Sequence, residues 1–134
     1  IGARLRARAR ETSRFHDTRL EPLLRGCFAH VALSNRDPEI VLANLNLLAT
    51  RLDQLALMVA PSPLLFGDQL TITDCGFVPT FALMKTLSGV FDFDLDVPQK
   101  LVDYENALTA HPSVTDHNTA YYAVLDAWVA SRLA

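Results

Sequence analysis

The sequence predicts an all-α fold, arranged as an orthogonal or up-and-down bundle of about five helices. Apolar residues recur every three or four positions through most of the chain, which is the period of a helix that buries one face. Helix-capping residues precede these runs, and glycine or proline follows them. At 134 residues the chain is long enough for one core and too short for two, so residues 1–134 are expected to form a single helical domain.

The first predicted helix covers about residues 3–32. Its apolar side chains form one helical stripe of Leu20, Leu23, Leu24, Cys27, Phe28 and Val31. Pro22 removes one backbone hydrogen bond inside this helix, and Gly26 weakens the next turn. We therefore expect a bend rather than a break.

A second helix begins after Asp37. This residue can act as the N-cap, with Pro38 at the first helical position and Glu39 complementing the helix dipole. Its apolar stripe is expected to be buried, and consists of Ile40, Val41, Leu45, Leu48, Leu52, Leu55 and Val59, broadened by Leu42, Leu47, Leu57 and Met58.

The third helix has the most specific start signal in the chain. Thr71 can accept from the backbone N–H of Asp74, while the Asp74 carboxylate accepts from the N–H of Thr71, which is a capping box. Leu70 and Cys75 occupy the two positions of a hydrophobic staple, so both are expected to be buried at the helix start. The capping box and the staple fix this helix start from both sides.

This third helix is apolar on most sides and is expected to be central, ending near residue 87. Pro79 inside it predicts a kink or a distorted turn, and Gly89 can end it. The following residues 91–96 alternate phenylalanine or leucine with aspartate. We interpret them as a loop that pins its aromatic side chains to the core, because a lone strand would have no partner.

A fourth helix follows Pro98 and ends near residue 110. The pair His111-Pro112 ends it, because a residue before proline is pushed out of the helical conformation. A fifth helix is expected from about Asp116, and it carries Tyr121, Tyr122, Val124, Leu125, Trp128 and Val129.

The net charge of −3 is unevenly distributed. Residues 1–36 contain eight arginines and three acidic residues, a charge of +5, which leaves −8 for the remainder. A basic segment raises the question of nucleic acid. On a helix, however, arginines at every second position fall into two stripes on roughly opposite sides, and the four in question are Arg4, Arg6, Arg8 and Arg10. We therefore expect no nucleic-acid partner.

No apolar run approaches the ~18 residues that span a bilayer, so no membrane segment is expected. Cys27 and Cys75 cannot build a disulfide framework, and apolar surroundings would make both poor nucleophiles. A reducing, cytoplasmic location fits this cysteine content. The arginine-rich start lacks a signal-peptide pattern, and Ile1 is expected to follow further residues of a longer chain.

Motifs with direct catalytic chemistry are missing from the sequence, including phosphate-binding loops, paired-cysteine metal spacings and nucleophile elbows. His111, Asp116 and His117 have the ligand types for zinc, but no pattern fixes their geometry, so we prefer solvated histidines. The aspartates after Phe91 have the spacing of a calcium loop without its glycine and glutamate. We assign no catalytic residue and no metal ligand.

Three segments together resemble the C-terminal all-helical domain of the glutathione S-transferase family. They are PSPLLFGD followed by LTITDC at residues 61–75, RFHD through LEPL at residues 14–23, and Tyr104-x-x-x-Leu108 with HPSV at residues 104–114. In that family a glycine turn leads into a capping box and staple on a buried central helix. The resemblance therefore marks the following as structural residues: Gly67, Leu70, Thr71, Asp74 and Cys75.

The resemblance also implies how activity is divided. In that family glutathione, and the Ser, Tyr or Cys that engages its sulfur, belong to a thioredoxin-like N-terminal domain, which we expect to be missing from these residues. The helical domain supplies the hydrophobic side of the cleft for a small electrophilic acceptor and part of a homodimer surface. We therefore expect conjugation, with glutathione as co-substrate, only together with that domain, and no cofactor in this chain.

The first helix lines the cleft between the two domains in that family. Here its residues at successive three- and four-residue steps form a polar stripe. We predict that this stripe borders the substrate, and it consists of Arg10, Arg14, Asp17, Thr18 and Glu21. The alternative is a stripe that only faces solvent.

A non-catalytic function also stays open. The same helical domain serves as an assembly module in translation factors and synthetase complexes. Upstream sequence discriminates between the two, because a thioredoxin-like segment with a cis-proline and a Ser, Tyr or Cys near its first helix favours the enzyme.

Overall fold

The computed structural model describes residues 2–134, and within that range it is helical without a β-strand. The predicted all-α class is therefore confirmed. The elements in chain order are α1 (Ala3–Phe15), a π-helical turn (His16–Leu20), α2 (Glu21–Arg25), 3₁₀ turns (Phe28–His30 and Leu33–Asn35), α3 (Pro38–Met58), α4 (Ile72–Val90), α5 (Gln99–Ala110) and α6 (Pro112–Leu133).

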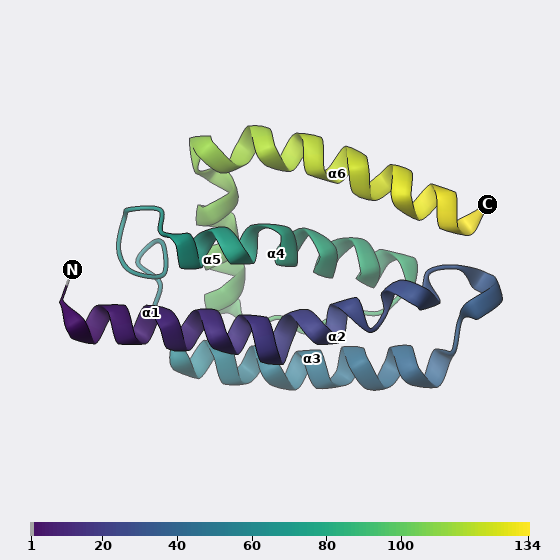
Figure 1. The fold of residues 1–134 in the computed structure, drawn as a ribbon, viewed down its shortest axis with the longest axis horizontal. Helices are drawn as coiled ribbons and strands as arrows, with labels where there is room; N and C mark the ends of the chain where they lie inside the picture. Colours follow the sequence, from purple (N-terminus) through teal and green to yellow (C-terminus); the bar gives the residue numbers. More distant parts are fainter. Residues whose placement is uncertain (1) are drawn as a thin grey trace.

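Helix α4 is the centre of the bundle (Figure 1). It contacts α1 and α2 on one side and α6 on the other, while α5 crosses it at a steep angle. Helix α3 lies alongside α1 and α2 at the bottom of the view. The predicted central position of the third helix is thus confirmed.

The core is built around aromatic side chains of α4. Phe77 and Phe81 both contact Tyr104 of α5 edge to face, with ring centroids 6.0 and 5.7 Å apart. Leucines from the π-helical turn, α2 and α3 belong to the same core, and those that are almost completely buried include Leu20, Leu24, Leu45, Leu48, Leu52 and Leu55.

The first helical segment departs from α-helical geometry next to the place where a bend was expected, and it is shorter than predicted. A π-helical turn, in which the Glu21 N–H donates to the His16 carbonyl, ends two residues before Pro22. The helix then ends at Arg25, not at residue 32, and 3₁₀ turns follow. At the end of α2 the chain comes so close to α3 that a Cβ on Gly26 would lie 2.9 Å from Asn44 Nδ2.

The second helix starts as predicted. Asp37 accepts from the backbone N–H groups of Glu39 and Ile40, at 3.0 and 3.4 Å. Its buried stripe is narrower than predicted, because the helix packs against its neighbours along one side. The residues that were expected inside but are exposed are Ile40, Leu42, Leu47 and Leu57.

The last helix begins four residues before the predicted Asp116. His111 caps it by accepting from the Ser113 N–H at 3.2 Å, and Pro112 takes the first helical position. Farther along, Leu125 is buried and Trp128 is half-buried, in edge-to-face contact with Phe28. No helix within residues 2–134 is long and apolar enough to cross a bilayer.

Candidate functional site

The start of α4 is organised around one buried carboxylate. Asp74 Oδ2 accepts from the N–H and the hydroxyl of Thr71 at 2.9 and 2.6 Å, and the Asp74 N–H donates to Thr71 Oγ1 at 3.4 Å. These contacts form the capping box that the sequence predicts. The other oxygen, Oδ1, accepts from the Leu65 N–H at 3.1 Å and from the Tyr104 hydroxyl at 2.9 Å.

Tyr104 keeps its proton in this arrangement. Burial raises the pKa of its phenol well above the ordinary value, and the neighbouring Asp74 carboxylate raises it further. A protonated phenol is a hydrogen-bond donor, so the bond to Asp74 persists through the neutral pH range.

The turn before α4 requires glycine. Gly67 has a φ of +114°, a conformation that side-chain-bearing residues rarely adopt. Its carbonyl accepts from the Leu64 N–H at 2.9 Å, which closes the turn beside the buried Leu64 and Leu65. This turn places the Leu65 N–H against Asp74.

The predicted staple does not bury Cys75. Leu70 is half-buried against the core, but the Cys75 thiol is exposed, so its assignment to a buried helix start is wrong. The first turns of α4 bury Thr73, Asp74 and Phe77, and Cys75 lies on another side of the helix. Cys27 is buried, and burial raises the pKa of its thiol, which makes it a poor nucleophile.

A groove of about 690 Å³ lies between the first helical segment and the start of α4. Four of the five predicted substrate-binding residues line it, namely Arg10, Arg14, Asp17 and Thr18. We call it the α1–α4 groove; Ile72 and Thr73 of α4 form its other wall. Glu21 does not line this groove, and its carboxylate accepts a 2.9 Å hydrogen bond from Arg25 Nε one turn farther along.

Hydroxyl groups hold the two walls of this groove together. The Ser13 hydroxyl donates to Thr73 Oγ1 at 3.1 Å, and the Thr73 hydroxyl is 3.5 Å from the Ala9 carbonyl. Thr73 is buried and Ser13 is half-buried, so these bonds fix how α1 lies on α4.

A buried histidine positions Asp17 at the groove. His16 is 7% exposed; its Nδ1 lies 2.8 Å from Asp17 Oδ1 and its Nε2 lies 2.6 Å from Thr80 Oγ1. A carboxylate only accepts, so the contact with Asp17 needs a proton on Nδ1. The Thr80 hydroxyl makes the second contact at Nε2 and also lies 3.3 Å from the Gly76 carbonyl. His16 and Asp17 are neighbours in the sequence, but the contact with Thr80 spans 64 positions and its only sequence signal is a hydroxyl in an apolar helix.

This hydroxyl, imidazole and carboxylate have the order of a catalytic triad, but the geometry excludes that role. Thr80 is 3% exposed and lies in the interface between His16 and α4, where a substrate cannot reach its oxygen. The Thr80 hydroxyl therefore supports His16, and His16 in turn holds the Asp17 carboxylate at the groove edge.

The groove is positively charged on its α1 side. Arg6, Arg10 and Arg14 are spaced by four residues, so they share one helix face, and all three line the groove. Arg8 lines a different, smaller groove of about 210 Å³, which agrees with the two arginine stripes expected from the sequence. Guanidinium groups beside the positive end of α4 favour anionic groups.

Within residues 2–134, no group of three or more His, Cys, Asp or Glu side chains is arranged to hold a metal ion. Comparison of the chain with models of known protein families, with curated proteins and with solved structures finds no match. Any assignment of function therefore depends on the residues of the chain and their geometry.

Proposed function

We propose that this chain is the helical domain of a cytoplasmic glutathione S-transferase-like protein. In this proposal the α1–α4 groove faces a thioredoxin-like domain and borders glutathione and a hydrophobic acceptor. The observation that carries the proposal is that Arg10, Arg14, Asp17 and Thr18 line one groove, beside the capped start of the central helix. If these polar side chains only faced solvent, there would be no reason for them to share a groove with residues of α4.

The chemistry of the groove fits a zwitterionic peptide. Glutathione carries carboxylates and an ammonium group, for which Arg10 or Arg14 and Asp17 are suitable partners. His16 holds the Asp17 carboxylate in place, which reduces the ordering cost of a contact. A covering domain would exclude water and strengthen these charged contacts.

Exposed apolar side chains support the rest of the proposal. Ile72 lines the groove and is 90% exposed, so a covering domain would remove a large apolar side chain from water. On the outer side of the bundle, Ile40 and Leu47 are exposed seven residues apart on α3. That helix face is available for the expected homodimer.

The test uses a protein in which this chain is joined to its thioredoxin-like domain. Arg14→Gln and Asp17→Asn should each change the KM for glutathione or for the acceptor severalfold, with little change in melting temperature. Arg8→Gln, which changes the same charge in a different groove, is the control and should leave both values unchanged. Unchanged kinetics in both groove variants would leave the solvent-facing interpretation.

A companion experiment tests the division between domains. This chain alone should not bind glutathione tightly or accelerate its conjugation, because the thiol-activating residue belongs to the other domain. Micromolar binding in a calorimetric titration of residues 1–134 would contradict that division.

The alternative is a non-catalytic assembly module of the same fold. The exposure of Leu57, at 89%, favours it, because this leucine lies away from the α1–α4 groove and its burial would require another partner. The joined protein separates the two proposals. An assembly module would show no conjugation, and Leu57→Ser would weaken its complex without affecting its fold.

A further inference from the structure

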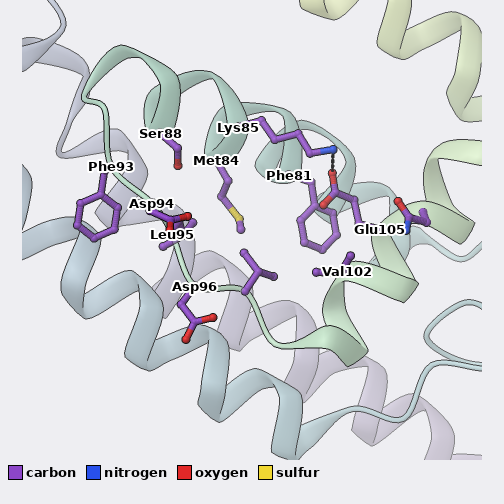
Figure 2. A pocket seen from close by; sticks show the side chains of 12 residues that line it. Phe81, Met84, Lys85, Ser88, Phe93, Asp94, Leu95, Asp96, Val102 and Glu105 are labelled. Carbon is purple, nitrogen blue, oxygen red and sulfur yellow. Dashed lines mark ion pairs between the residues drawn. The ribbon is translucent and has the colours of Figure 1, made fainter.

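A second cavity, of about 630 Å³, lies between the last turns of α4, residues 93–97 and the first turns of α5 (Figure 2). Its inner surface is apolar and includes Phe81, Met84, Leu95 and Val102. Its volume is in the range of small-molecule sites, roughly 300–1,000 Å³. None of its lining residues belongs to the α1–α4 groove, so it is a separate site and does not depend on the function proposed above.

Acidic groups dominate the polar edge of this cavity. Asp94, Asp96 and Glu105 line it together with one cation, Lys85. Asp94 and Asp96 are exposed, and no hydrogen bond or ion pair within residues 2–134 engages their carboxylates. The lining therefore has an excess of two negative charges.

The alternation in residues 91–96 produces this arrangement. In an extended segment successive side chains point to opposite sides. Here Phe93 and Leu95 are half-buried against the core, and the intervening aspartates remain at the surface. The pattern that resembled a strand thus places acidic groups directly beside an apolar surface.

Glu105 brings a buried negative charge to the same cavity. It is 8% exposed, and its Oε1 lies 2.6 Å from the Lys85 ammonium, the ion pair drawn in Figure 2. Lys85 is the cation that pairs with this carboxylate, and no other residue within 2–134 donates to Oε1. The Lys85 side chain is 59% exposed, so its ammonium can be solvated by water if a ligand cation takes its place beside Glu105.

We propose that this cavity binds a small amphipathic cation, an arylalkyl- or alkylammonium ion. Its hydrocarbon part lies on Phe81, Met84 and Val102, and its ammonium group lies at the acidic edge. Burial of the hydrocarbon supplies affinity, and Met84 adapts to its shape. An anionic ligand of the same shape is rejected, because it would face three carboxylates across a partly desolvated cavity.

The test compares three probes with one hydrocarbon body: 2-phenylethylammonium, 2-phenylethanol and 3-phenylpropanoate. The protein is labelled with ¹³C in its methionine methyl groups, which gives one signal from Met84 and one from Met58, because the chain has two methionines. Met58 lines a different groove and serves as the internal control. The ammonium probe should shift the Met84 signal and leave the Met58 signal unchanged. The alcohol should bind more weakly than the ammonium, and the carboxylate should bind most weakly.

Charge variants then locate the cation. The double variant Asp94→Asn and Asp96→Asn should reduce the affinity for the ammonium probe by about fivefold, which is the effect of removing two partly screened charges. Its affinity for the alcohol should not change. Glu105→Gln retains the side-chain shape and should also reduce the preference for the ammonium over the alcohol. Asp53→Asn, which removes an exposed charge far from this cavity, is the control.

Three results would overturn the proposal. One is an unmoved Met84 signal at about 10 mM probe, where a Kd of about 1 mM would give near-saturation. Another is equal affinity for the ammonium and the alcohol. The third is unchanged ammonium affinity in the double aspartate variant, whose exposed positions leave folding intact.

Discussion

The Tyr104 hydroxyl of α5 donates a 2.9 Å hydrogen bond to Asp74 Oδ1 at the start of α4, and both side chains are almost completely buried. The same carboxylate accepts from Leu65 in the preceding turn and from Thr71 at the helix N-cap. A residue that caps one helix therefore also fixes the helix that crosses it and the turn that precedes it. Four donors converge on Asp74.

Tyr104→Phe should destabilise the domain by about 1–2 kcal/mol, because it removes one donor from a buried carboxylate and leaves the packing intact. Urea unfolding measures this difference. Tyr121→Phe is the matched control, since that hydroxyl makes no hydrogen bond within residues 2–134, and it should change stability by less than about 0.5 kcal/mol. Equal effects of the two variants would mean that the bond to Asp74 contributes nothing.

Asp74→Ala should cost more than an ordinary cap, about 3–5 kcal/mol, because it strands several buried donors at once. Thr71→Ala removes the N-cap side chain and should cost about 1 kcal/mol. The double variant should lose less than the sum, since the two residues share their hydrogen bonds. Thermal denaturation of the three variants measures these values. A stability of Asp74→Ala close to that of the parent would refute the role of this carboxylate.

Alkaline pH should destabilise the domain through Tyr104. Its folded pKa is raised, chiefly by burial, while the unfolded phenol titrates near pH 10. The folded state therefore retains a proton that the unfolded state loses. The stabilisation is complete below about pH 10 and falls above it by about 1.4 kcal/mol per pH unit.

Urea titrations between about pH 8 and pH 11 measure this effect. Cys27, Lys85, Tyr121 and Tyr122 also have raised pKa values, so the parent should lose stability through several groups. The Tyr104→Phe variant lacks one of these titrating groups. Its free energy of unfolding should therefore fall less steeply with pH than that of the parent, by the contribution of one proton. Parallel curves for parent and variant would exclude Tyr104 as a contributor.

Replacement of two glycines by alanine should change the stability of the domain in opposite directions. Neither has a neighbour within 4 Å of the position that a Cβ would take, so the backbone alone decides. Gly67 has a φ of +114°, so Gly67→Ala should lower the free energy of unfolding by about 1–3 kcal/mol. Gly89 lies inside α4, so Gly89→Ala should raise the free energy of unfolding by about 0.5–1 kcal/mol. Melting temperatures measure both, and destabilisation by Gly89→Ala would show that the close of α4 needs glycine.

The capped starts of α3 and α4 were the most predictable features of this chain. Asp37 caps residues two and three positions away, and Thr71 and Asp74 cap each other across three positions. Such contacts form between neighbours along the chain, so the local residue types specify them. The polar stripe of Arg10, Arg14, Asp17 and Thr18 was predictable for the same reason, because helical spacing alone places these residues on one face.

Tertiary structure decided the features that depend on distant residues. His16 meets Thr80 across 64 positions, and Tyr104 meets Asp74 across 30. Gly26, at the end of α2, lies so close to α3 that an added Cβ would meet Asn44, and the exposure of Cys75 depends on which side of α4 the other helices cover. Helix periodicity identifies an apolar or polar face but not its neighbour, because burial is a property of two surfaces in contact. The sequence by itself therefore determined the helical periodicity and the caps of α3 and α4, and packing determined which faces became core, groove and cavity.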